Sequence, residues 1–377
     1  MSHLPVEIIT KILFRLPVKS LLRFLCVSKS WYDLTKHPAF IKLHLHRSIG
    51  TNRDHTLIFG KTYKACRSYS AVPRYFVSVH FPSKNHFDKG LKLHQPLYCG
   101  RRSIRILGYC HGLVCIYHKT QEITIWNPLI AIWNPLIRKY KILLRERILK
   151  PSDLKNVQPL GEFEVKVYSL RLDSWRKIED QWPKKECKIS STSASLNGAL
   201  HWLVAEDISY DMHRWMGLVC LLAFDLAIEK FQVFKTLVQQ KIDLETGLEV
   251  LKGQLCFIEL TNEYNDVWLM KESREASSWT RIYKIGPCLR SFSYCKPLMF
   301  SENEKKILLE MCHLKHTKLV WYEIEKNREE SVKIQNLPNS LWKFGTATCV
   351  GSLLLLDGHN VIDPAEQKKK KTNKRKR

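Results

Sequence analysis

The sequence predicts an α+β multidomain protein, with a small helical segment over residues 2–46, a β-rich, degenerate propeller-like domain over 50–360 and a disordered basic tail over 364–377. Three observations predict this. Apolar residues recur at helical spacing in the first 46 positions, short apolar runs then alternate with Gly, Asn, Asp and Pro, and the last ten residues, KKKKTNKRKR, contain no apolar side chain. A chain of 377 residues, 45% of them hydrophobic, is long enough for two or three domains.

The N-terminal segment is predicted to hold short helices joined by tight turns. Pro5 suits the first position of a helix, and apolar residues come after it at one-, three- and four-residue steps. Pro17 ends this helix because proline lacks the N–H that the helix ladder needs. Ser28 is expected to cap a third helix that ends near Pro38. So short a segment cannot bury all of its apolar side chains, and the exposed remainder indicates a protein–protein site.

Two types of run recur after His46. In the first type a glycine turn leads into an apolar strand, at residues 108–117, 195–204, 250–259 and 349–358. In the second a strand leads through a polar turn to an aromatic or β-branched residue, at 122–128, 165–178, 221–234, 267–282 and 319–334. The marker residues of the second type are 49, 56, 48 and 53 residues apart, at Trp126, Trp175, Phe231, Trp279 and Val332. A period near 50 is typical of a kelch-like propeller blade, and a β-sandwich or an irregular stack of sheets is the alternative.

A direct tandem duplication interrupts this pattern. Residues 125–131 read IWNPLIA and residues 132–138 read IWNPLIR, so six of seven positions match. The extra copy adds an Asn-Pro turn where one strand end is expected, and two apolar copies compete for one core position. We therefore expect the copy to displace a strand and to leave Trp133 without a blade to pack into.

Charge and composition limit the classes of function. The net charge is +25, and the tail supplies only eight of the 61 basic residues, so the positive excess extends over the rest of the chain. A basic chain favours acidic partners, either nucleic acid or an acidic protein surface, and an ordinary solvated surface is the commoner alternative. The longest apolar run, 217–224, is too short to cross a membrane, and the charged N-terminus does not resemble a secretory signal. Twelve cysteines without a C-x-x-C pair favour a reducing compartment. The aromatic residues match the strand pattern, which favours packing over base stacking.

The sequence contains no recognisable catalytic or ligand-binding motif. Phosphate-binding glycine loops, the nucleophile elbow and the zinc hydrolase signatures are all missing from the sequence. The nearest metal-like spacings are Cys110-His111 with Cys115, and Cys312-His313 with His316. Neither supplies four ligands at a recognisable spacing, so we predict no metal, cofactor or catalytic residue, while a nucleophilic Cys/His pair stays open.

The N-terminal residues resemble an F-box. The matching features are Leu4-Pro5, the turn from Leu16 to Leu21 and the stretch CVSKSW from Cys26 to Trp31. The rest of the chain, to about residue 360, resembles the F-box-associated interaction domain of a large flowering-plant family, through GYCHGLVCIY, ITIWNP, EVKVYSLRLDSW, LNGALHWL, AFDLAIEKF and SWTRIYKI. The family carries a strand-rich stretch where residues 139–163 of this chain do not fit the pattern, and this predicts a missing strand beside the duplication.

The resemblance implies a substrate-recruiting, non-catalytic subunit of an SCF-type ubiquitin ligase. The F-box would bind a Skp-family adaptor, and through it a cullin, and the C-terminal domain would bind an unidentified target protein for ubiquitination. The apolar adaptor contact is expected from Leu4, Pro5, Ile8, Leu13, Leu16, Pro17, Leu21, Leu22, Val27 and Trp31. Two alternatives remain: a basic nuclear protein that binds nucleic acid through the β-domain and tail, which we rank lower, and a kelch-like enzyme whose site the sequence does not reveal. No membrane partner is expected.

The basic tail predicts a nuclear location, with the cytoplasm as a second compartment. Two clusters of four basic residues fit the acidic grooves of nuclear import receptors. They comprise Lys368, Lys369, Lys370, Lys371, Lys374, Arg375, Lys376 and Arg377. The alternative is a tail that only improves solubility.

Overall fold

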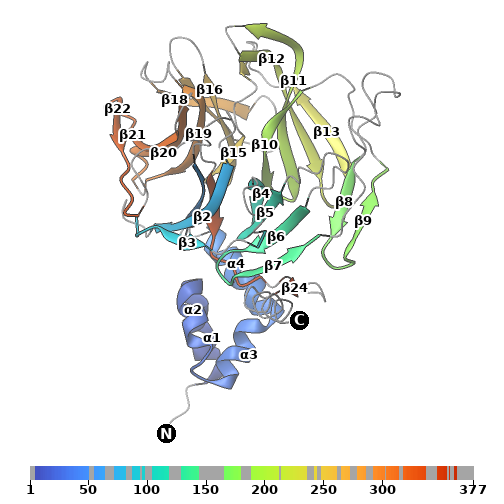
Figure 1. The fold of residues 1–377 in the computed structure, drawn as a ribbon, viewed down its shortest axis with the longest axis vertical. Helices are drawn as coiled ribbons and strands as arrows, with labels where there is room; N and C mark the ends of the chain where they lie inside the picture. The colour runs from blue at the N-terminus through green and yellow to red at the C-terminus, as the bar shows by residue number, and fades with distance from the viewer. Residues whose placement is uncertain are drawn as a thin grey trace, which may run out of the picture.

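The structure is a computed structural model in which four N-terminal helices lie on one side of a ring of β-sheets (Figure 1). It describes residues 5–50, 55–63, 72–81, 87–93, 96–97, 104–118, 129–143, 165–179, 188–211, 214–235, 242–243, 248–260, 265–271, 278–285, 292–301, 303–313, 317–336, 346–354, 356 and 361–362. Within that part of the chain, no helix is both long enough and apolar enough to cross a membrane. The tail and the nuclear-targeting residues lie outside the described residues.

The helical segment contains α1 (Val6–Arg15), α2 (Val18–Phe24), α3 (Lys29–Lys36) and α4 (Pro38–Gly50). Pro17 separates α1 from α2 as predicted, and Pro5 directly precedes α1 instead of occupying its first turn. The Ser28 side chain accepts a hydrogen bond from the Trp31 amide at 3.2 Å, which confirms the predicted cap. The fourth helix was not predicted. Pro38 opens it, because a missing N–H costs nothing at the first helical position.

Five sheets form the blades of the ring. Blade 1 has the strand order β23-β1-β2-β3 and blade 2 the order β24-β7-β6-β5-β4. Blade 3 runs β10-β11-β12-β13 with β14 beside β12, and blades 4 and 5 run β15 to β18 and β19 to β22. A separate hairpin pairs β8 with β9. The predicted degenerate propeller is therefore confirmed, and the β-sandwich alternative is not.

The strands are grouped by blade. Blade 1 holds β1 (His55–Tyr63), β2 (Val72–Phe81), β3 (Leu91–Leu93) and β23 (Thr346–Val350), and blade 2 holds β4 (Ile104–Cys110), β5 (Leu113–His118), β6 (Leu129–Asn134), β7 (Lys139–Ile142) and β24 (Val361–Ile362). The hairpin is β8 (Lys166–Ser169) and β9 (Ser174–Lys177), and blade 3 is β10 (Lys188–Leu196), β11 (Ala199–Asp211), β12 (Arg214–Asp225), β13 (Lys230–Lys235) and β14 (Ile242–Asp243). Blade 4 is β15 (Glu249–Leu251), β16 (Gln254–Leu260), β17 (Asn265–Met270) and β18 (Trp279–Ile285), and blade 5 is β19 (Phe292–Phe300), β20 (Lys306–His313), β21 (Thr317–Glu323) and β22 (Arg328–Ser331).

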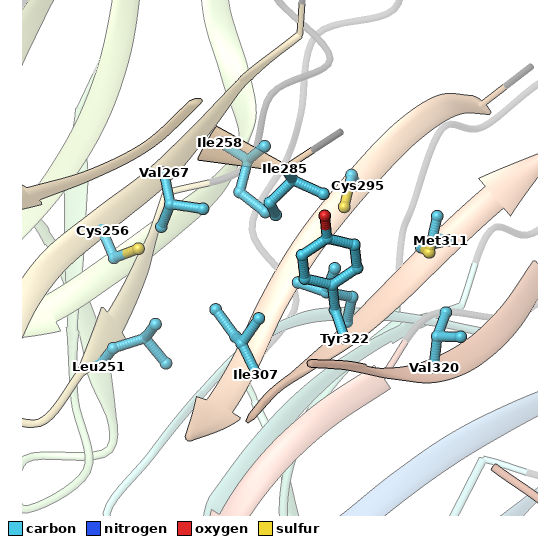
Figure 2. Packing of buried hydrophobic residues seen from close by; sticks show 11 residues of the cluster. Leu251, Cys256, Ile258, Val267, Ile285, Cys295, Ile307, Met311, Val320 and Tyr322 are labelled. Atoms are coloured by element: carbon cyan, nitrogen blue, oxygen red, sulfur yellow. The ribbon is translucent and has the colours of Figure 1, made fainter. Parts of the chain in front are cut away.

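The main cores lie between adjacent blades, because a single sheet cannot bury its own faces. Figure 2 shows the core between blades 4 and 5, where Ile258 and Val267 face Ile307 and Tyr322. Similar clusters join blades 3 and 4, blades 5 and 1, and blades 1 and 2. Strand β23, from near the end of the chain, pairs with β1 and thereby closes the ring.

The recurring runs correspond to hairpins. Three runs of the first type turn through a residue pair with positive φ: His111-Gly112, Asn197-Gly198 and Lys252-Gly253. Two-residue turns whose twist matches that of a hairpin need positive φ at both positions, and glycine adopts this conformation without steric cost. The run at 349–358 differs, since β23 ends at Val350 and residues 351–354 are not a strand. The four second-type runs from 165 onward form the hairpins β8–β9, β12–β13, β17–β18 and β21–β22.

The expectation that Trp133 has no blade to pack into is wrong. Trp133 is 1% exposed on β6, and its ring centroid lies 5.7 Å from that of Phe76. Residues 129–131 of the first copy extend the same strand, and residues 139–142 form β7. The rest of the stretch in which the pattern predicts a missing strand, residues 144–163, lies outside the described residues. Alternate residues Ala131 and Trp133 both face the core, so the second copy keeps the inward register and the extra residues precede it. Residues 125–128, including the marker Trp126, lie outside the described residues.

Candidate adaptor-binding surface

The F-box helices pack around one hydrophobic core. Leu13, Val18, Leu21, Phe40 and Ile41 are buried together, and each fully buried aliphatic side chain stabilises the fold by about 1.5–3 kcal/mol. Two of these residues come from α4, so the unpredicted helix completes the core.

Helix α4 also satisfies the end of α1. The Nε2 atom of His44 donates to the Leu16 carbonyl at 2.8 Å, and Arg47 Nη1 donates to the Phe14 carbonyl at 3.0 Å. Carbonyls in the last turn of a helix lack partners within that helix, so these bonds fix α1 against α4. The guanidinium of Arg47 also lies over the Phe14 ring, 5.5 Å from its centroid.

An apolar face remains exposed on the F-box helices. Ile8 and Ile12 are 45% and 46% exposed and lie one helical turn apart on α1. Val27, between α2 and α3, is 57% exposed, and Val6 and Tyr32 are exposed as well. Apolar side chains left on the surface of a small helical unit indicate a protein–protein contact.

The predicted adaptor residues fall into three groups. Pro5, Ile8 and Val27 are exposed, and four others are half-buried: Leu16, Pro17, Leu22 and Trp31. Leu13 and Leu21 have no exposed surface, so in this structure they support the helices instead of forming the surface. Leu4 lies outside the described residues. The prediction omitted the exposed Val6, Ile12 and Tyr32. Of these, Ile12 could have been found from the sequence, because it lies four residues after Ile8 and therefore on the same helix face.

The F-box packs directly on the segment after β23. Leu353 belongs to the F-box core, and Leu136 and Leu354 pack against it. A side chain at Gly351 would place its Cβ 3.1 Å from Val18, so glycine permits the close approach of chain and helix. The contact fixes the helices relative to the ring, because residues 351–354 continue from the strand that closes it.

Asn134 of the duplicated motif supports this junction. Its Nδ2 donates to the carbonyls of Ser352 and Leu354 at 3.0 and 3.1 Å. Its Oδ1 accepts from the amide of Leu136 at 3.2 Å, so one buried side chain joins the β6–β7 turn to the segment under the F-box. This position of the second IWNPLI copy suits asparagine, because its amide group both donates and accepts and can satisfy several backbone groups at once.

A buried polar network joins the inner strands at the centre of the ring. Glu249 on β15 accepts from the Tyr109 hydroxyl of β4 at 2.6 Å and lies 2.5 Å from Lys296 Nζ of β19. Lys296 also donates to the Thr346 carbonyl of the closing strand at 3.3 Å. The Glu310 carboxylate accepts from both the amide, at 3.2 Å, and the hydroxyl of Thr346. Four blades are therefore linked through charged and polar groups.

Burial controls the titration of two groups in this network. Burial, reinforced by the neighbouring Glu249 carboxylate, raises the pKa of Tyr109 well above its usual range. Burial also raises the pKa of Glu310, although Lys296 and the hydrogen bonds from Thr346 act in the opposite direction. These residues make hydrogen bonds inside the ring, which fits a structural role.

The metal-like spacings do not assemble into a site that the structure describes. No group of three His, Cys, Asp or Glu side chains that could hold a metal occurs among the described residues. Cys115 is partly buried on β5, and burial raises its pKa to about 11. For Cys312, His313 and His316, the side chains lie outside what the structure describes.

Comparison with protein families gives two matches. An F-box domain model matches residues 1–43, and a model described as F-box associated beta propeller domain matches residues 132–354, more than half of the chain. The chain belongs to the F-box-associated β-propeller family. The second match begins at the first residue of the second IWNPLI copy, the copy that occupies the buried register of β6.

Curated relatives of this family extend over most of the chain. F-box protein CPR1 of Arabidopsis thaliana is 26% identical over 398 residues, which cover 94% of this chain and 89% of CPR1. An F-box/kelch-repeat protein of the same plant is 26% identical over 341 residues, covering 80% and 83% of the two chains. Among solved structures, TolB from Acinetobacter baumannii overlaps at a TM-score of 0.32 and 10% identity, covering 75% of this chain and 54% of TolB.

Proposed function

We propose that this chain is the substrate-recruiting, non-catalytic subunit of an SCF-type ubiquitin ligase. The F-box helices bind a Skp-family adaptor, and through it a cullin, while the propeller binds a target protein. The exposed apolar face of α1, with Ile8 and Ile12, supports this proposal most directly, because it lies on the F-box itself.

The junction between F-box and ring supports the same function. A receptor must present its target at a defined position relative to the adaptor, which requires a fixed connection between the two parts. Leu353 within the F-box core and Asn134 beneath it make such a connection. A relative named as an F-box/kelch-repeat protein aligns with 80% of this chain and over 83% of its own length.

The test is co-purification of the full chain with a Skp-family adaptor. The variant Ile8→Asp/Ile12→Asp places two charges on the exposed face without emptying the core. Interface anchors contribute about 2 kcal/mol each, so losing one weakens binding about 30-fold and losing both abolishes recovery. Val233→Asp on β13 is the matched control, since Val233 is 40% exposed on the propeller. Retained binding in the double variant with an intact fold contradicts the proposal.

We propose further that the basic tail directs the protein to the nucleus. Deletion of 368–377 removes eight positive charges and no apolar side chain, so a fluorescent fusion should shift to the cytoplasm. Thermal stability should not change. An unchanged nuclear distribution would leave the tail with solubility as its role.

A further inference from the structure

Four hairpin turns of the ring share one backbone conformation. They join β6 to β7, β8 to β9, β12 to β13 and β21 to β22. In each turn the residue directly before the second strand has a φ between 52° and 59°: Arg138, Asp173, Glu229 and Asn327. The residues before this position therefore stand at equivalent places and can be compared directly.

Two of these turns carry large aliphatic side chains that the turn itself does not require. In the β21–β22 turn the residue before the positive φ is the exposed Lys326, so a polar side chain suits this position. The equivalent residues are Leu172, which is 69% exposed, and Ile228, which is 58% exposed. Leu226, in the same turn as Ile228, is 46% exposed. Turns usually carry small or polar residues, so the three aliphatic side chains need another explanation.

The β6–β7 turn shows what an aliphatic residue on such a turn can do. Leu136 lies in this turn and packs against the F-box core. One of the four turns is therefore already a docking contact, and the helices that cover it leave Leu172, Leu226 and Ile228 exposed. A group of exposed aliphatic side chains indicates an interaction site, whereas single ones are ordinary.

The β8–β9 and β12–β13 turns are joined at the outer edge of the ring. Arg176 on β9 donates to Glu229 of the other turn, with 2.5 Å between Nη1 and Oε2. Figure 1 shows the β8–β9 hairpin next to β13. On its other side, Asp173 lies 2.9 Å from Lys141 Nζ of blade 2. We call the exposed side chains of these two turns and their flanks the outer-turn surface: Leu172, Leu226, Ile228, Arg171 and Lys230.

The outer-turn surface presents positive charge. The acidic side chains near it already have partners: Asp173 pairs with Lys141, Glu229 pairs with Arg176, and Asp225 accepts from the Ala227 amide at 2.9 Å. Arg171 and Lys230 stay exposed beside the aliphatic side chains.

This charge selects among the occupants. A basic rim around an apolar centre favours an acidic partner. A second copy of the chain, with a net charge of +25, and the chain's own basic tail would both be repelled. The adaptor is expected on the face of α1 that carries Ile8 and Ile12, and Figure 1 shows α1 and α3 farther from the ring than α4.

We propose that the outer-turn surface docks an acidic segment of the target protein. Aliphatic side chains of that segment cover Leu172, Leu226 and Ile228, and its carboxylates face Arg171 and Lys230. The inference rests on the proposed role of the propeller as the target-binding part of the chain. It adds the place at which the target binds and the chemistry that the surface recognises.

The test uses a phage library of random linear peptides, which is selected on the full chain. Peptides that also bind Leu172→Asp/Ile228→Asp are removed by counter-selection. Both side chains are exposed, so this variant places charge on the surface without emptying the core. The remaining peptides should combine acidic with aliphatic residues. A pool that is empty after counter-selection, or one without an excess of acidic residues, would overturn the proposal.

Fluorescence anisotropy with one selected peptide then measures the contribution of each part of the surface. Leu172→Asp or Ile228→Asp should weaken binding about 30-fold, as expected for an interface anchor. Arg171→Glu/Lys230→Glu should weaken binding at low salt and flatten its salt dependence, because rim charges act mainly through long-range attraction. Lys326→Asp is the matched control, since it changes the equivalent residue of the β21–β22 turn and should bind like the parent. Equal affinities in all variants would contradict the proposal.

Adaptor co-purification and the oligomeric state identify the other occupants. If Leu172→Asp/Ile228→Asp no longer recovers the adaptor, the surface belongs to the adaptor. If the parent forms a dimer that this variant dissociates, the surface belongs to a second copy. Either result overturns the proposal. Failure of the parent chain to recover the adaptor would instead contradict the proposed role of the F-box, because the peptide selection needs no adaptor.

Discussion

Removal of the Lys296 charge should strongly destabilise the ring. Lys296 is 4% exposed, its Nζ lies 2.5 Å from Glu249 Oε1, and it donates to the Thr346 carbonyl of the closing strand. Lys296→Met keeps most of the side-chain volume, so the cavity term is small. It leaves the buried Glu249 carboxylate with the Tyr109 hydroxyl as its remaining partner in this network.

The size of the effect depends on the burial of both charges. Removing one partner of a buried pair costs about 3–5 kcal/mol, because the other charge stays desolvated and uncompensated. At about 2–4 °C per kcal/mol for a domain of this size, the melting temperature should fall by about 6–20 °C. The double variant Lys296→Met/Glu249→Gln removes both charges and should regain most of that loss, since the glutamine oxygen still accepts from Tyr109.

The measurement is the midpoint of thermal unfolding by circular dichroism, with urea unfolding as a second probe. Lys306→Met is the matched control, because Lys306 lies 2.6 Å from Glu330 in an exposed pair on blade 5. Exposed pairs contribute about 0–1 kcal/mol, so this variant should melt close to the parent. A melting temperature of Lys296→Met within about 2 °C of the parent would refute this prediction, because a broken buried pair should cost at least about 6 °C. A double variant that is as unstable as the single one would refute it as well.

Two further predictions concern the turns and the pH dependence. Gly112→Ala should destabilise more than Gly198→Ala, because both glycines have positive φ but only the first would meet Ser352, while the second has open space; equal urea midpoints would contradict this. Since folding raises the pKa of Glu310, the folded state binds its proton more tightly, and the stability that this proton adds should be lost as pH rises from about 4.5 through the folded pKa. Urea unfolding of the parent relative to Glu310→Gln should show that fall, and a difference that is flat or rises with pH would contradict it.

Local sequence determined the helix breaks, the turns and the repeated blades. Pro17 acts through its missing N–H and Ser28 through a side-chain bond to the nearby Trp31 amide, and the x-Gly turns require positive φ. None of these features depends on distant residues. The period near 50 residues indicated the propeller because each blade repeats one hairpin pattern. Cys110 and His111 are neighbours in the sequence, whereas the Ser195 hydroxyl that the Cys110 thiol contacts lies 85 residues further along and could not be predicted from local sequence.

Tertiary contacts decided what the local pattern left open. Helical spacing shows that Leu13 and Ile8 lie on α1, but α4 and the segment after β23 determine that the first is buried and the second exposed. Two identical IWNPLI copies have the same local preferences, and pairing with β5 and β7 places Trp133 of the second copy in the core. Lys141 is fully buried because Asp173 of the β8–β9 hairpin reaches it at 2.9 Å. No local signal encodes such a partner, since the energy that permits a buried charge comes from a residue that only folding brings close.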